Sequence, residues 1–109
     1  MIYKIFIVPI ITILAGYLMY KHPPKKINPI VGYRTRKSMK NKKNWNKANK
    51  YCGFVWIKAG IINLIISTVL CILQLLKIIV FTETLIAWIV LIQIIPLLIA
   101  IFIVEKQLL

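Results

Sequence analysis

The sequence predicts an all-α integral membrane protein with three transmembrane helices. Three apolar runs, at residues 5–20, 54–76 and 85–104, are each close to or above the length that a helix needs to cross a bilayer. Hydrophobic residues make up 61% of the chain, well above the roughly half that is usual in a soluble domain. Because lipid offers the backbone no hydrogen-bond partner, we expect each run to be helical.

We expect the chain to form a single membrane module, residues 1–109. Its expected parts are span 1 at about residues 2–20, a basic loop with an interfacial amphipathic helix at 21–52, span 2 at about 53–76, an outer loop at 77–84, span 3 at about 85–104, and a tail at 105–109.

The basic residues are distributed unevenly along the chain. Eleven of the fifteen Lys and Arg residues lie between positions 21 and 50, whereas Glu83 and Glu105 are the only acidic residues. Cytoplasmic loops of membrane proteins carry an excess of Lys and Arg. We therefore expect the basic loop and the C-terminus to be cytoplasmic and the N-terminus to lie outside.

An amphipathic helix is expected to lead from the basic loop into span 2. Pro23 and Pro24 end span 1, and Ser38 is a suitable cap for a new helix. Apolar and lysine positions then alternate with helical spacing from residue 39 onward. The helix either runs straight into span 2 or bends, with Gly53 and Gly60 as the candidate bend points.

Polar residues form a stripe within the apolar spans. On span 2 they recur with helical spacing, which predicts that they face spans 1 and 3. The expected stripe on span 2 consists of Asn63, Ser67, Cys71 and Gln74, and its expected partners are Thr12 and Gln93. Helix–helix hydrogen bonding is favoured over a substrate path as their role. Thr12 and Gly16 are also spaced for a close helix contact.

The sequence offers little for catalysis, metal binding or coupled transport. His22 is the only histidine, Asp is absent, and neither a metal-ligand cluster nor a phosphate-binding glycine loop is present. No acidic residue lies within a span, although a proton- or sodium-coupled transporter normally needs one. We expect a protein that is not an enzyme and has no cofactor. There are two alternatives. One is a small channel or permease formed by oligomers, and the other is a membrane enzyme that uses a loop around Arg34.

The basic loop is expected to contact membrane lipid. Lysines beside a membrane set topology and attract anionic lipid, and we favour these roles over protein binding and, last, over nucleic-acid binding. One stretch of the loop contains more than the basic residues that topology requires. Its arginine lies in a constrained turn, and the planar guanidinium can form two parallel hydrogen bonds to a carboxylate or a phosphate. The residues of this motif are Asn28, Gly32, Tyr33, Arg34, Thr35, Ser38, Met39, Asn41 and Trp45.

This motif, followed by a membrane span, resembles that of the SdpI family of bacterial membrane proteins, which is named for immunity to a secreted killing peptide. The resemblance implies a non-enzymatic immunity protein of the bacterial cell membrane. It also implies a signalling role, in which a cytoplasmic regulator is held at the membrane when the toxin is present. On this hypothesis the motif stabilises the inner face or binds the regulator. The outer loop at residues 77–84 and the outer halves of the spans would then meet the toxin.

Overall fold

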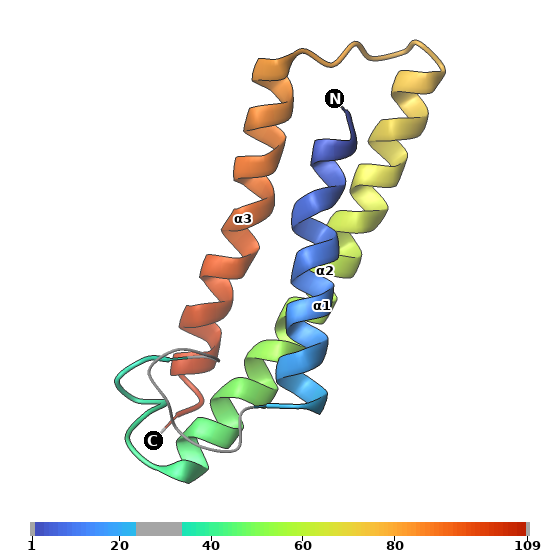
Figure 1. The fold of residues 1–109 in the computed structure, drawn as a ribbon. Helices are drawn as coiled ribbons and strands as arrows, with labels where there is room; N and C mark the ends of the chain where they lie inside the picture. Colours follow the sequence, from blue (N-terminus) through green and yellow to red (C-terminus); the bar gives the residue numbers. More distant parts are fainter. Residues whose placement is uncertain (1, 24–33, 109) are drawn as a thin grey trace.

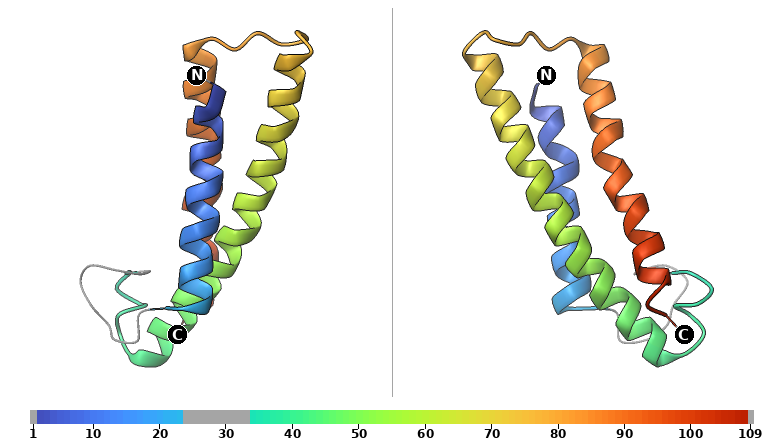
Figure 2. Two further views of the ribbon diagram at one scale, coloured as in Figure 1. Left: turned by 45° about the vertical axis from the view of Figure 1, so that its right-hand side comes forward. Right: turned by 180° about the vertical axis from the view of Figure 1, so that it is seen from behind.

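Three long helices form the bundle seen in the computed structural model, which describes residues 2–23 and 34–108 (Figures 1 and 2). A short 3-10 helix, η1 (Ile2–Phe6), leads into α1 (Ile7–Lys21), which is followed by α2 (Lys42–Leu75) and α3 (Glu83–Glu105). The helices alternate in direction, so the N- and C-termini lie at opposite ends of the bundle (Figure 1). All three are long and apolar enough to cross a membrane, and the described residues include no strand. The predicted all-α membrane fold is therefore confirmed.

Large apolar side chains cover the outside of the bundle. Leu14, Ile65 and Leu98, one from each helix, are 60%, 59% and 55% exposed. Exposure of this extent along whole helices would be unfavourable in water, but it suits contact with lipid acyl chains. The outer surface therefore agrees with a bundle that is solvated by a bilayer.

Apolar side chains are buried mainly in two clusters. One consists of Ala48, Cys52, Val104 and Leu108, and it joins the start of α2 to the end of α3. The other consists of Ile5, Phe81 and Ile86, and it joins η1 to the α2–α3 connection and the start of α3. Apolar side chains thus pack the bundle together at each of its ends.

Close contact between α1 and α2 depends on three glycines. A Cβ atom at Gly53 would lie 2.5 Å from the carbonyl oxygen of Gly16 and 2.6 Å from the backbone nitrogen of Tyr20. At Gly60 the nearest atom would be a side-chain carbon of Ile13, also at 2.6 Å. Small residues let helix backbones approach in this way. The prediction that Gly16 marks a close contact is therefore confirmed.

The basic amphipathic segment and span 2 form one continuous helix. α2 runs without interruption through 34 residues, including Gly53 and Gly60, so the amphipathic part is not a separate helix. It ends at Leu75 in a Schellman motif, in which the N–H of Ile78 donates to the Leu73 carbonyl at 3.0 Å. Lys77 takes the left-handed conformation that this motif requires, with φ 59°.

Candidate functional site

The described part of the basic motif begins with a compact turn between Thr35 and Ser38. The N–H of Thr35 donates to the Ser38 Oγ at 2.8 Å, and the N–H of Ser38 donates to the Thr35 Oγ1 at 3.2 Å. The Ser38 hydroxyl also donates to the Thr35 carbonyl at 2.9 Å. The two side chains thus bond each other's backbone, and Ser38 is completely buried. Such reciprocal bonds fix the backbone of a segment that lies outside any helix.

Asn41, rather than Ser38, caps α2. Its side-chain oxygen accepts a hydrogen bond of 2.8 Å from the N–H of Asn44, three residues later. The expectation that Ser38 caps this helix was wrong because its hydroxyl is used within the turn. The Asn44 amide donates in addition to the Lys37 carbonyl at 3.0 Å. Asn44 therefore ties the turn to the first turn of the helix.

Trp45 anchors the motif in the interior of the protein. Its side chain is completely buried, as are those of Ala48 and Asn49 along the same helix. The Asn49 amide donates to the Trp45 carbonyl at 2.8 Å within the helix. The described part of the motif, residues 34–45, is therefore folded at the end of the bundle where α2 begins. We call this segment the motif platform.

Only some of the remaining motif residues lie in the part of the chain that the structure describes. Asn28, Gly32 and Tyr33 lie outside the described residues. Arg34 is exposed and adjoins the Thr35–Ser38 turn. The structure thus brings Thr35, Ser38, Asn41 and Trp45 together, with Arg34 at the edge of the same platform. What this platform binds stays a prediction.

A second polar site lies between the spans, around the carbonyl oxygen of Ile5. Ser67 donates its hydroxyl to this oxygen at 2.8 Å, and Gln93 donates its amide to the same oxygen at 2.9 Å and to the Ser67 Oγ at 2.9 Å. Pro9, four residues after Ile5, has no N–H with which to make the usual α-helical bond to that carbonyl. The proline thus leaves an acceptor in η1 for donors from α2 and α3.

The predicted polar stripe is only partly assembled. Asn63 extends it, because its amide donates to the Gln93 carbonyl at 3.2 Å. Gln74 does not join it, and its Oε1 is buried without a partner among the described residues. Thr12 was wrongly expected to meet the stripe, since its hydroxyl donates to the Val8 carbonyl of its own helix at 2.6 Å. The assembled part links all three helices, which fits the helix-bonding role that the spacing favoured.

The end of the bundle opposite the motif carries an ion pair beside an open groove. Lys4 Nζ lies 3.2 Å from Glu83 Oε2, and both side chains are well exposed. An open cavity of about 370 Å³ adjoins them, lined by Lys4, Glu83, Ile86, Ala87, Val90 and Leu91. We call this cavity the outer groove, because the predicted orientation would place it outside the cell; it is mostly apolar, with one charge of each sign at its edge.

Two features that matter in the structure, the Asn44 side chain and the Ile5 carbonyl, were not predicted from the sequence. The role of Asn44 could have been predicted from its position, since it stands three residues after Asn41, a residue type that favours helix N-caps. The Ile5 carbonyl was signalled only through Pro9, because a proline leaves the carbonyl four residues before it without its usual donor. Neither signal identifies the partner, which depends on how the helices pack.

Comparison with known proteins places the chain in a family. The profile of the SdpI/YfhL protein family matches residues 25–104, which include the motif, α2 and nearly all of α3. The uncharacterized protein YfhL of Bacillus subtilis (strain 168) is 41% identical over 73 residues, covering 63% of this chain and 66% of that relative. The match thus spans slightly less than two thirds of the relative's length. No solved structure matches the chain. The chain is a multi-pass membrane protein that belongs to the SdpI/YfhL protein family.

Proposed function

We propose that this protein protects the cell that makes it from a secreted, membrane-active peptide. Membership in the SdpI/YfhL family supports an immunity-type membrane protein, and this is the observation that carries the proposal. The protein acts by binding and not by catalysis.

The outer groove is the proposed contact for the peptide. Its apolar lining suits the hydrophobic side chains of a membrane-active peptide, while Lys4 and Glu83 offer polar contacts at its edge. This assignment requires the end that carries Lys4 to lie outside the cell. The excess of Lys and Arg at the other end supports that orientation.

The motif platform is the proposed contact for a cytoplasmic regulator. Its turn is held by several short hydrogen bonds, so a partner would meet a surface that is already ordered. Arg34 is exposed at its edge. Binding of the peptide at one end and of a regulator at the other would give the protein both family activities.

Expression in a bacterial strain that is sensitive to such peptides tests the protective role. Cells that make the protein should survive a peptide that kills the parent strain. The Ala87→Trp variant, which fills the outer groove, should lose protection while accumulating normally in the membrane. The matched variant Ile92→Trp adds the same side chain at a position that is 60% exposed and does not line the groove, and it should still protect. Unchanged killing across a panel of peptides would count against immunity.

The regulator contact is tested separately with two arginines. Arg34→Ala should abolish peptide-dependent recruitment of a cytoplasmic regulator to the membrane fraction, whereas Arg36→Ala, an equal charge change two residues away, should not. Equal effects of the two variants would indicate that only the overall charge of this end matters.

A further inference from the structure

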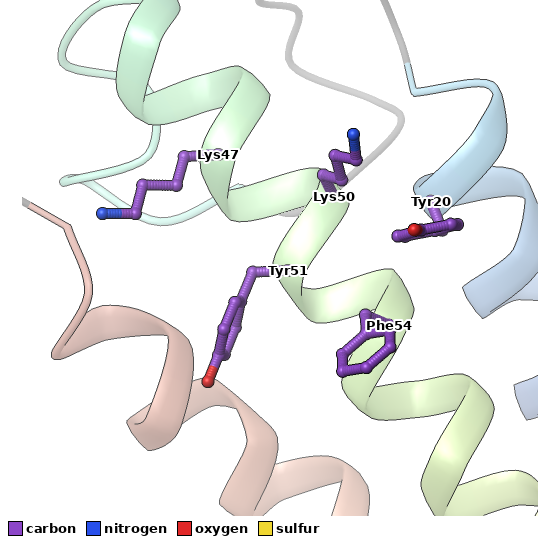
Figure 3. Close-up of a pocket in the computed structure, with 5 residues that line it drawn as sticks. All are labelled: Tyr20, Lys47, Lys50, Tyr51 and Phe54. Atoms are coloured by element: carbon purple, nitrogen blue, oxygen red, sulfur yellow. The ribbon is translucent and has the colours of Figure 1, made fainter.

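A second open cavity lies where α1 ends beside α2, at the basic end of the bundle (Figure 3). Its volume is about 390 Å³, and it is lined by Tyr20, Lys47, Lys50, Tyr51 and Phe54. The four α2 residues follow one another at intervals of three, one and three positions, so they share one face of that helix. Tyr20 comes from the last turn of α1. We call this cavity the Tyr20–Phe54 groove.

The Tyr20–Phe54 groove combines an aromatic surface with lysines at its edge. The rings of Tyr20 and Phe54 lie 6.0 Å apart between centroids. Lys50 Nζ lies 5.5 Å and Lys21 Nζ lies 5.3 Å from the Tyr20 ring centroid, and Lys58 Nζ lies 4.6 Å from that of Phe54. Each distance is within the range of a cation–π contact. Several positive charges therefore surround an apolar surface, and no acidic side chain lines it.

The distribution of charge along α2 indicates that the groove lies where a bilayer changes from polar to apolar. The first part of α2 contains Lys42, Lys43, Lys47 and Lys50, of which the last two line the groove. After Lys50, the only charged residue in the rest of α2 is Lys58. Phospholipid phosphates lie at this boundary, with their acyl chains extending to the apolar side. In Figure 3, Lys47 and Lys50 leave α2 in different directions, and the rings of Tyr51 and Phe54 follow along the helix towards the span.

We propose that the Tyr20–Phe54 groove binds one anionic phospholipid. Lys47 and Lys50 attract the anionic headgroup from two sides of the groove, and the glycerol and upper acyl chain lie along the Tyr51 and Phe54 rings. A lysine near an anionic membrane surface strengthens binding by about fivefold. An acidic protein segment would also satisfy the lysines. The lipid fits better because the groove opens at bilayer depth and its surface between the lysines is aromatic.

Lipid retention by the purified protein tests this site. The protein is placed in phosphatidylcholine bilayers that contain a minor fraction of phosphatidylglycerol, and the lipids that stay bound after extraction are counted by native mass spectrometry. Wild-type protein should retain phosphatidylglycerol in preference to phosphatidylcholine. Lys47→Gln/Lys50→Gln should reduce that preference roughly tenfold or more, since two lysines at about fivefold each are lost.

The matched control is Lys40→Gln/Lys42→Gln, which removes the same charge from exposed positions outside the groove and should keep the preference within about twofold. Equal losses in the two double variants would overturn the site and leave only a general attraction to the basic end. Displacement of the lipid by inorganic phosphate alone, or by an acidic peptide at equal concentration, would also overturn it. None of these measurements depends on protection against a peptide, so this inference and the proposed function can fail independently.

Discussion

Gln93 on α3 donates a hydrogen bond of 2.9 Å to the backbone carbonyl of Ile5, a residue 88 positions earlier in the chain. Ser67 on α2 donates to the same oxygen at 2.8 Å. One carbonyl thus receives donors from the two other helices of the bundle. Because Pro9 offers no N–H to this oxygen, these donors replace a bond that the helix itself does not make.

Replacing Gln93 should therefore loosen the bundle. Gln93→Leu keeps the side chain's approximate size but removes its hydrogen bonds to Ile5 and Ser67, at about 0.6 kcal/mol for each interhelical bond. We expect a loss of about 1 kcal/mol in the free energy of unfolding, measured by denaturant titration in detergent micelles. Gln74→Leu is the control and should not lower stability, because it removes a buried oxygen that has no hydrogen-bond partner among the described residues. Similar losses in both variants would show that the polar cluster adds nothing specific.

The glycines at the α1–α2 contact should differ in their tolerance of alanine. Gly53→Ala would bring a methyl group against backbone atoms of Gly16 and Tyr20, which cannot move without separating the helices. We expect a loss of about 1–3 kcal/mol, measured as above. Gly60→Ala should cost less, because its nearest contact is the Ile13 side chain and its nearest backbone atom is 3.2 Å away. The reverse order would mean that this contact is looser than the structure indicates.

Trp45 should be essential for the motif platform. Trp45→Ala removes a completely buried aromatic side chain, for which we expect a loss of about 3–5 kcal/mol and reduced accumulation in the membrane. Trp88→Ala removes the same side chain from a position that is 60% exposed, and the protein should accumulate normally. Immunoblotting of membrane fractions compares the two. Normal levels of the Trp45 variant would contradict a structural role for this tryptophan.

Single cysteines should reveal which end of the bundle faces the cell exterior. Lys40 and Thr84 are exposed at opposite ends, so Lys40→Cys and Thr84→Cys can each be introduced after Cys52→Ala and Cys71→Ser. A membrane-impermeant maleimide should label position 84 in intact cells and position 40 only after lysis. This follows from the excess of Lys and Arg between residues 21 and 50. Labelling of position 40 in intact cells would reverse the proposed roles of the outer groove and the motif platform.

The spans and the family could be predicted because both depend on local sequence. Apolar runs of sufficient length need no tertiary information, and the motif from Asn28 to Trp45 is contained in a single stretch of sequence. Pairing of Gln93 with the polar side of α2 was also expected, since helical spacing places the polar residues of that helix on one side.

Other details depended on competition between nearby partners. Ser38 and Asn41 are both good cap residues, and their spacing does not decide which one is taken by a turn instead. Thr12 had both its own helix and a neighbouring helix as acceptors, and it bonds the Val8 carbonyl. The Tyr20–Phe54 groove could not be foreseen, because it requires the last turn of α1 to lie beside a particular turn of α2.

The length of α2 has a mechanical consequence. With a rise of about 1.5 Å per residue, its 34 residues extend about 51 Å, whereas the hydrocarbon layer is about 30 Å thick. Roughly 20 Å of the same rigid rod must therefore stand beyond that layer. The closest backbone contact between this helix and α1 lies at Gly53, about a third of the way along it. One continuous hydrogen-bonded backbone thus joins the basic end of the protein to the opposite side of the bilayer, and its two ends cannot move apart without breaking helical hydrogen bonds.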